Sequence, residues 1–403
     1  MKITDIRCHV LVDPDYDITS TSSSQDDIVV EIETDEGLIG IGEADVNPWI
    51  AKACIEAPGT HTMGLGIRDT LIGADPLQVE ALWDRLYVGT AMNGRRGAVV
   101  HAYGAVDMAL HDLRGKILGK PVWQLFKDVD AAPTPRQTVP YASLQPEPGG
   151  FEQYTDSMVN WALVAKKFGF TALKAEVTVN GPYAHHGMQE PYRRAGEVLA
   201  AVREAVGDDF TLMCDVQYMF PDARTCLDVV EDWADLNLRF LETPLSFDDL
   251  DGYAEVAAHA PMPIAAGEFL ATRFEFLDLM DRGRVSVVQP DMGRVGGLTE
   301  AMRVGRLAQE RGLTVVPHVW KTGLSIAAAV NFAAATPGCE FVEYLPAELS
   351  ESPLRQQLIR NVPELIDGRL SPSTAPGLGV ELDRDALEHF ASAAAALDRG
   401  TGA

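Results

Sequence analysis

The sequence of 403 residues predicts an α/β fold: a (β/α)8 TIM barrel preceded by a smaller domain of sheet and helix. Two observations carry this prediction. In the first third of the chain, apolar and polar residues alternate around a short turn, as in antiparallel strands with one buried face. Beyond residue 137, short continuous apolar runs alternate with amphipathic stretches, the pattern of parallel strands covered by helices. A hydrophobic content of 46% is ample for a large buried core.

The first domain is expected to begin with antiparallel strands. Residues 28–34 (IVVEIET) alternate, residues 35–37 (DEG) form a turn, and the chain returns over residues 38–42. Residues 13–25 are rich in Ser and Thr with few apolar anchors, which predicts a mobile surface loop. Apolar residues at helical spacing predict a helix over about residues 97–118.

A Pro- and Ala-rich link, residues 131–137, marks the boundary of a first domain over residues 1–130. Eight apolar runs then predict strands at residues 138–144, 171–177, 210–216, 238–242, 264–268, 285–290, 313–318 and 341–344. Eight βα units within roughly 200 residues fit a (β/α)8 barrel, which we assign to residues 131–353. The remaining segment, residues 354–403, is too long for a barrel cap alone and should pack back on the first domain.

Charge and cysteine content exclude several classes of function. The net charge of −26 argues against non-specific binding to nucleic acid or to anionic membranes. Five scattered cysteines without a CxxC spacing predict a reduced, cytoplasmic protein and argue against a zinc site. The N-terminus lacks an apolar signal core, and the most apolar stretch, residues 327–335, is too short to span a bilayer.

Acidic residues recur at the ends of three consecutive predicted strands. Asp215, Glu242 and Glu268 follow one another at steps of 27 and 26 residues, about one βα unit each. The strands should therefore direct three carboxylates to the C-terminal mouth, where barrel enzymes carry their active sites. A single acid at a strand end is more often a helix N-cap or an ion-pair partner. Three acids at one repeat length favour a hard divalent cation, and all-oxygen ligands favour Mg²⁺.

The series continues along the chain with three further polar residues. Asp291, His318 and Glu343 end the last three predicted strands, again about one βα unit apart. An Asp and a His on neighbouring strands suggest an imidazole whose tautomer and basicity are set by the carboxylate. A lone His would more often be structural, but this one should face the same mouth as the metal.

Lys174 and Glu176 lie two residues apart on the second predicted strand, so both should point inward. A buried Lys near a cation could act as a base or as a hydrogen-bond donor. The alternative is a Lys–Glu ion pair that fills the mouth of the barrel.

Together these residues give the chain a close resemblance to the enolase superfamily, and within it to the mandelate racemase subgroup. Residues 104–126 (GAVDMALHDLRGKILGKPVWQLF) look like that family's linker helix. The resemblance covers almost the whole chain and implies a modified barrel with an α+β capping domain. It also implies abstraction of a proton α to a carboxylate. The matching positions are Asp215, Glu242 and Glu268 for the three Mg²⁺ ligands, Asp291 and His318 for the His–Asp pair, and Glu343 for the acid that binds the substrate carboxylate.

The chain departs from the subgroup at one position. The subgroup usually carries Lys-x-Lys on the second barrel strand, with the second Lys as a base, whereas this chain has Lys174-Ala175-Glu176. The first Lys matches the one that contacts the substrate carboxylate. Racemisation needs a base on each face of the α-carbon, but dehydration needs only one, because an imidazolium can return its proton to a departing hydroxyl. The sequence therefore predicts a dehydratase with His318 as its base.

The expected substrate is an acid sugar of the aldonate type, converted to a 2-keto-3-deoxy acid. Its carboxylate would contact Mg²⁺, Lys174 and Glu343. Polar residues near the mouth that could bind its hydroxyls are Tyr141, Gln217, Tyr218, His185 and His186.

Three alternatives to dehydration stay open. They are a racemase or epimerase of a hydroxy acid, a non-catalytic sugar-acid-binding relative, and an aldolase that forms a Schiff base on Lys174. The expected partner is a small carboxylate, with no nucleic acid and no membrane. Barrels of this kind often associate, so we also expect a homo-oligomer.

Overall fold

The computed structural model describes residues 1–20, 22–126 and 135–400. The chain begins with an antiparallel sheet in the order β1-β2-β3, formed by β1 (Ile3–Val12), β2 (Asp26–Thr34) and β3 (Ile39–Ala44). The turn between β2 and β3 contains Gly37, whose φ of 78° lies in the left-handed region that favours glycine. The predicted hairpin is therefore confirmed.

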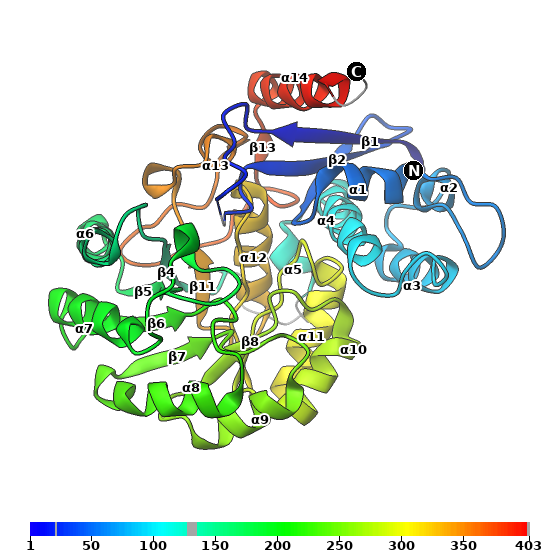
Figure 1. The fold of residues 1–403 in the computed structure, drawn as a ribbon. Helices are drawn as coiled ribbons and strands as arrows, with labels where there is room; N and C mark the ends of the chain where they lie inside the picture. Colours follow the sequence, from blue (N-terminus) through cyan, green and yellow to red (C-terminus); the bar gives the residue numbers. More distant parts are fainter. Residues whose placement is uncertain (21, 127–134, 401–403) are drawn as a thin grey trace.

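Five helices follow this sheet in the N-terminal part of the capping domain (Figure 1). They are α1 (Pro48–Glu56), α2 (Ile67–Leu71), α3 (Val79–Gly89), α4 (Ala98–Leu118) and α5 (Val122–Leu125). The long helix α4, predicted over residues 97–118, packs on β3. Gly40 and Gly42 permit this close approach, because a Cβ at either position would lie 2.1 Å from a carbonyl oxygen of α4.

The second domain is a nearly closed barrel of eight parallel strands in the order β10-β9-β8-β7-β6-β5-β4-β11. The strands are β4 (Val139–Leu144), β5 (Ala172–Glu176), β6 (Thr211–Asp215), β7 (Leu238–Glu242), β8 (Ile264–Ala266), β9 (Val287–Val288), β10 (Thr314–Val315) and β11 (Phe341–Tyr344). All eight predicted strands are present, although β9 and β10 are only two residues long. In the described chain no ladder joins β10 to β11, so the barrel stays open there.

Helices cover the outside of the barrel (Figure 1). They are α6 (Phe151–Phe168), α7 (Arg194–Val206), α8 (Ala223–Val230), α9 (Leu250–His259), α10 (Thr272–Asp278), α11 (Leu298–Glu310) and α12 (Gly323–Ala335), with short 3-10 or π turns at 185–187, 231–236, 279–283 and 347–349. Helix α6 ends at Gly169, which adopts a left-handed conformation and closes the last turn.

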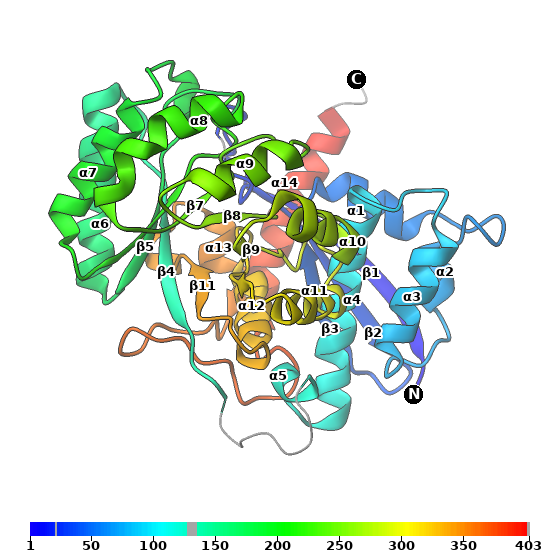
Figure 2. The ribbon, with the colours of Figure 1, turned by 90° about the horizontal axis from the view of Figure 1, so that it is seen from below.

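The chain after the barrel returns to the capping domain, as expected. It forms α13 (Pro353–Gln357), β12 (Ile359–Arg360), β13 (Glu381–Leu382) and α14 (Arg384–Gly400). Figures 1 and 2 both show α14 beside β1, and these two elements pack together. Arg384 at the start of α14 pairs with Glu31 on β2 at 2.7 Å. The exact domain limits stay predictions, and residues 131–134 of the proposed link lie outside the described residues.

The interior of the barrel contains an apolar layer to which seven of the strands and Val316, the residue after β10, contribute. Its members are Val139, Tyr141, Ala172, Met213, Phe240, Ala265, Val287, Val316 and Phe341. Because side chains two residues apart share a strand face, the inward-pointing residues that follow this layer reach the C-terminal mouth. The layer thus forms a solid floor on which the site is built.

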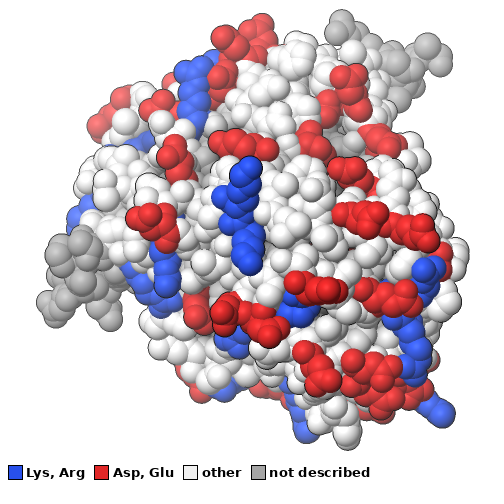
Figure 3. Space-filling view, turned by 90° about the vertical axis from the view of Figure 1, so that its left-hand side faces the viewer, with Lys and Arg blue, Asp and Glu red and all other residues white. Residues whose placement is uncertain are grey.

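The surface carries the acidic excess of the composition. Figure 3 shows acidic side chains scattered over one face, with fewer basic side chains, several of them beside acidic ones. Within the described ranges, no helix has the length and apolar character needed to cross a bilayer.

Candidate active site

The three predicted metal-binding acids lie at the C-terminal mouth of the barrel. Asp215 and Glu242 are the last residues of β6 and β7 and are partners in the strand register. Glu268 comes two residues after the end of β8. All three side chains are buried. The repeat of about one βα unit therefore does bring three carboxyl groups to neighbouring strands at one end of the barrel.

The structure does not gather these carboxylates around one point, and each makes contacts with other side chains, although Lys174 lies near both Glu242 and Asp215. The contacts include Thr243 Oγ1 to Asp215 Oδ1 at 2.6 Å, Lys174 Nζ to Glu242 Oε1 at 2.7 Å and Tyr218 OH to Glu268 Oε1 at 2.7 Å. Among residues 1–20, 22–126 and 135–400, no group of three or more His, Cys, Asp or Glu side chains has the arrangement of a metal site. The predicted trio therefore shares a region of the barrel, but not a centre.

The chemistry of this donor set nevertheless fits a hard cation. Burial, and then the nearby charge of Glu242, raise the pKa of Asp215 well above its ordinary value. Burial also raises the pKa of Glu242, against the opposing effect of Lys174. A divalent cation would lower the pKa of both carboxyl groups, because nearby positive charge favours the ionised carboxylate. Asp215, Glu242 and Glu268 supply the oxygen ligands that Mg²⁺ prefers, and these are the residues that would hold it.

The predicted His–Asp pair is brought together. Asp291 and His318 form a parallel bridge beyond β9 and β10, and His318 Nδ1 lies 2.7 Å from Asp291 Oδ2. The other carboxylate oxygen of Asp291 accepts a hydrogen bond from the Gly293 amide at 2.6 Å. Nε2 on the opposite side of the imidazole lies 3.0 Å from Glu268. The carboxylate of Asp291 thus fixes the ring and leaves Nε2 on the side of the predicted metal ligands.

Lys174 and Glu343 also meet, although they come from β5 and β11. Lys174 Nζ lies 2.9 Å from Glu343 Oε1, and Glu343 Oε2 accepts a hydrogen bond from the Val319 amide at 2.8 Å. Burial lowers the pKa of Lys174, but the charges of Glu242 and Glu343 outweigh it and raise the pKa well above its ordinary value. Lys174 is therefore an ammonium group that can donate hydrogen bonds.

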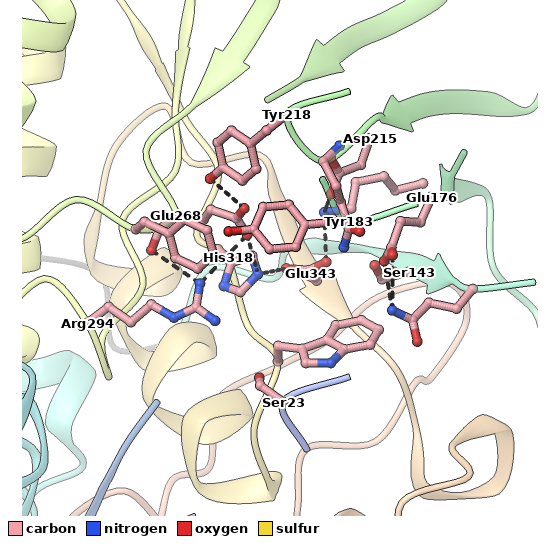
Figure 4. Close-up of a pocket in the computed structure, with 15 residues that line it drawn as sticks. Ser23, Ser143, Glu176, Tyr183, Asp215, Tyr218, Glu268, Arg294, His318 and Glu343 are labelled. Carbon is pink, nitrogen blue, oxygen red and sulfur yellow. Dashed lines mark hydrogen bonds and ion pairs between the residues drawn. The ribbon is translucent and has the colours of Figure 1, made fainter. Parts of the chain in front are cut away.

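Of these groups, Lys174, Asp215, Glu268, His318 and Glu343 line a cavity of about 140 Å³ (Figure 4). Its lining comprises Ser23, Ser143, Gln145, Lys174, Glu176, Tyr183, Asp215, Gln217, Tyr218, Glu268, Phe269, Arg294, His318, Trp320 and Glu343. The predicted substrate contact Gln217 is among them, and its side-chain oxygen has no hydrogen-bond partner in the described structure.

Tyr141 lies elsewhere than the prediction placed it. It belongs to the apolar layer beneath the cavity and is fully buried. The strand β4 reaches the cavity with Ser143 instead, and Gln145 follows just beyond its end. These residues are two and four positions further along, as the alternation of side chains requires.

The predicted pair of histidines divides into one buried and one exposed residue. His185 is buried, and its Nε2 lies 2.6 Å from Glu176 Oε1, whereas His186 is exposed. Glu176 lines the cavity opposite Arg294 (Figure 4), whereas His185 is outside this lining and belongs to that of a neighbouring cavity. The sequence placed Glu176 inward but gave no sign that His185 was its partner.

Two further charged residues were missed from the sequence. Arg294, three residues after Asp291, lines the cavity and pairs with Asp45 at 2.5 Å. Asp45 follows β3 in the capping domain, so this contact joins residues 249 positions apart. The position of Arg294 just beyond a strand end was a usable signal, but no local pattern could have found its partner.

The chain matches two family models and several known proteins. The matches are the mandelate racemase / muconate lactonizing enzyme N-terminal domain over residues 6–126 and an enolase C-terminal domain-like model over residues 157–386. The chain is 32% identical to D-galactarolactone cycloisomerase of Agrobacterium fabrum over 402 residues, with 97% of this chain and 99% of the relative covered. It is 29% identical to arabinonate dehydratase of Saccharolobus solfataricus over 365 residues, with 90% of each covered.

A solved structure also resembles this chain over nearly its whole length. The crystal structure of 3,6-anhydro-D-galactonate cycloisomerase from Zobellia galactanivorans superposes with a TM-score of 0.81 at 28% identity, covering 97% of this chain and 99% of that one. The C-terminal family model alone spans more than half of the 403 residues. From the two domain matches, the barrel and the capping domain, we conclude that the chain belongs to the enolase superfamily, in its mandelate racemase subgroup.

Proposed function

We propose that this protein is a Mg²⁺-dependent enzyme that removes the proton α to the carboxylate of an acid sugar and expels the oxygen on the β-carbon. The observation that carries the proposal is His318, which lines the cavity with Asp291 bonded to its far nitrogen. Relatives named as dehydratases and cycloisomerases support a lyase or isomerase acting on an acid sugar. Members of the enolase superfamily generally use Mg²⁺.

The substrate carboxylate would bind between Lys174 and Glu343. Lys174 donates hydrogen bonds to it, and the anionic neighbours of Lys174 keep its amine protonated. Magnesium bound by Asp215, Glu242 and Glu268 would supply positive charge that favours an enediolate over the parent acid. His318 would then face the α-carbon of the bound substrate.

The reaction has two proton transfers through one imidazole. In the first, the α-proton moves to His318 Nε2, and the C–H electron pair enters the carboxylate as an enediolate. Asp291 stabilises the resulting imidazolium through Nδ1. In the second, the electron pair forms the C=C bond, the bond to the β-hydroxyl breaks, and the imidazolium protonates the departing oxygen to give water. The enol then tautomerises to a 2-keto-3-deoxy acid.

Cycloisomerisation is the second candidate, and it uses the same residues. Where the β-oxygen belongs to a ring, its elimination opens the ring without loss of water, and the product is an isomer of the substrate. Two of the relatives carry cycloisomerase names, which favours this outcome for a cyclic acid sugar. The difference between the two reactions lies in the substrate's leaving group and not in the base.

Racemisation, aldol chemistry and binding without catalysis have less support. A racemase needs a base on the second face of the α-carbon, and there Glu176 replaces the subgroup's second Lys. An aldolase needs a neutral Lys174, but its acidic neighbours raise the pKa of its ammonium group. A non-catalytic binder would have no need of an imidazole oriented by a carboxylate.

The test is a screen of acid sugars and their lactones with Mg²⁺ for formation of 2-keto acids. We expect turnover by the wild type, loss of turnover on chelation, and a loss of roughly 100-fold or more in His318→Asn. His259→Asn is the matched control, because His259 lies on the exposed surface at the end of α9. Undiminished keto acid formation in His318→Asn, or with chelator present, would overturn the proposal.

A further inference from the structure

A second pair of histidine and carboxylate lies across the cavity from the one used in the proposed reaction. Glu176 Oε1 lies 2.6 Å from His185 Nε2. The amide nitrogen of Gln145 donates to both oxygens of Glu176, at 3.1 and 2.9 Å. His185 and Glu176 are both buried. The carboxylate is therefore held from two directions before any ligand binds.

His185 is itself fixed by a tyrosine of the covering helix. The Tyr154 hydroxyl, on α6, lies 3.1 Å from His185 Nδ1 and accepts a hydrogen bond from the Thr178 amide at 3.0 Å. Tyr154 is fully buried. This chain of polar contacts leads from the outside of the barrel to Glu176 and has no role in the reaction described above. Such support is what a binding site needs to hold one side chain in a single orientation.

The two pairs face the cavity in opposite senses. In the Asp291–His318 pair the imidazole lines the cavity and the carboxylate stands behind it. In the second pair the carboxylate of Glu176 lines the cavity and His185 stands behind. A carboxylate offers roughly four acceptor positions, and the three contacts described leave capacity on Oε2. Glu176 therefore presents an acceptor, which suits a hydroxyl group of a substrate.

Each cation of the cavity has an acidic partner, and Lys174 is the one that the proposed reaction assigns to the reacting carboxylate. Lys174 is paired with Glu242 and Glu343, Arg294 with Asp45, and His318 with Asp291. Around Glu176, the lining also contains the neutral side chains of Gln145 and Ser143, together with Lys174 and the carboxylate of Asp215. Figure 4 shows Arg294 at the opposite side of the site from Glu176 and Ser143. A second carboxylate on the substrate would thus meet Glu176 without a free cation beside it.

The region beyond this end is also acidic. A neighbouring cavity of about 550 Å³ shares Ser143, Gln145 and Trp320 with the first. Among the described residues its lining contains no Lys or Arg; its titratable side chains are the histidines His185 and His186 and six carboxylates, Asp13, Asp15, Asp17, Glu147, Glu348 and Glu351. A substrate that extends in this direction with a negative end would be repelled, whereas a neutral polyhydroxyl end would find acceptors.

We propose that Glu176, positioned by His185 and Gln145, binds a hydroxyl at the distal end of the substrate and excludes acid sugars with a second carboxylate there. The site therefore selects monocarboxylates, such as aldonates or their cyclic forms, over aldarates. This inference rests on the proposed function for the orientation of the substrate, with its reacting carboxylate at Lys174. Glu176 is a specificity-determining residue, and His185 is a positioning residue behind it.

The experiment compares aldonates and aldarates that share the configuration of their internal carbons. With Mg²⁺ present, kcat/KM is measured for each pair, and binding is measured by calorimetry. The wild type is expected to favour the aldonate by about tenfold or more, because like charges repel strongly at a buried site. Glu176→Gln should abolish most of this preference, with its loss on the aldonate falling on KM more than on kcat. His185→Gln should reduce the preference less than Glu176→Gln does.

Glu197→Gln is the matched control, because this substitution makes the same chemical change on the exposed face of α7. It should keep the wild-type preference. An aldarate that is used or bound as well as its aldonate by the wild type would overturn the inference, as would a preference unchanged in Glu176→Gln. If no acid is turned over, the proposed function fails, and the calorimetric preference still decides the inference.

Discussion

At the scale of single residues, His318 is oriented from behind by its contact with Asp291. Asp291 Oδ2 lies 2.7 Å from Nδ1, and the Gly293 amide holds the other oxygen of the same carboxylate. An imidazole that carries its proton on Nδ1 can accept a proton at Nε2, the atom that lies 3.0 Å from Glu268 in this structure. Asp291 therefore acts through His318 and is a positioning residue.

Replacing this carboxylate tests that role. Asp291→Asn should lower kcat by about 100-fold, because an amide can hold the imidazole in the wrong tautomer and stabilises the imidazolium less. KM should change much less than kcat, since Asp291 does not line the cavity. The measurement is steady-state kinetics of 2-keto acid formation, with unfolding by urea to verify stability. A fall confined to KM would contradict this role.

Some residues of the site could be predicted from the sequence and others could not. The strand-end acids and His318 were predictable because a repeat of one βα unit fixes their height in the barrel. Tyr141 was placed one layer too high, because the sequence does not show where on β4 the apolar floor ends. The contact of His185 with Glu176 was not predictable, since it depends on the path of an irregular loop after β5.

At the scale of elements, the cap depends on the close packing of α4 against β3. Gly40 and Gly42 lie against the backbone of α4, where a Cβ on Gly42 would come within 2.1 Å of the Ala105 carbonyl oxygen. The sequence predicted both elements from periodicity. It could not predict their contact, because glycine in a strand has several explanations.

Gly42→Ala should therefore destabilise the protein by about 3 kcal/mol, because backbone on both sides leaves little room to relax. Gly150→Ala is the control, since a Cβ there meets nothing within 4 Å. The free energy of unfolding in urea is the measurement. Equal stabilities of the two variants would show that α4 and β3 are less tightly packed than described.

Helix α4 also carries a buried acid that makes stability depend on pH. Burial raises the pKa of Asp107 to about 7, although hydrogen bonds to Thr299 oppose the shift. Between its ordinary pKa of 3.8 and about 7, the folded state holds a proton that the unfolded state has lost. Stability thus falls as pH rises through this window, and the penalty is complete above pH 7.

Asp107→Asn should remove this dependence, because its amide cannot ionise. Relative to the variant, the wild type should lose about 2 to 3 kcal/mol of unfolding free energy between pH 5 and pH 8. Urea unfolding of both proteins at the two pH values gives the difference. Parallel pH profiles for the two proteins would contradict the assignment to Asp107.

At the scale of the whole molecule, the capping domain contributes charge to the mouth of the barrel. Asp45 follows β3 and pairs with Arg294 at 2.5 Å and with Lys321 at 3.3 Å, both from the barrel. Arg294 also lies 3.7 Å from Glu268, so the cap reaches a predicted metal ligand through one side chain.

The homo-oligomer expected from the sequence stays a prediction, and light scattering would measure the oligomeric state.

Breaking this contact should affect both stability and activity. Asp45→Asn should cost about 3 kcal/mol of stability, because it leaves two buried cations without their shared partner. It should also lower kcat/KM, since Arg294 would be free to approach Glu268 more closely. Glu56→Gln is the control, because Glu56 is an exposed residue that pairs with Lys52 at 4.0 Å. If the Asp45 variant were as stable and as active as the control, this contact would support neither the stability nor the activity of the protein.

A crystal structure with magnesium and an unreactive acid-sugar analogue bound would decide whether the three acids form a metal site. We predict one ion held by Asp215, Glu242 and Glu268, with the analogue's carboxylate at Lys174 and its α-carbon facing His318 Nε2. The separate partners of the three acids would then have given way to a shared cation. Three carboxylates that kept their separate partners in saturating magnesium, with the analogue bound elsewhere, would contradict the proposed site.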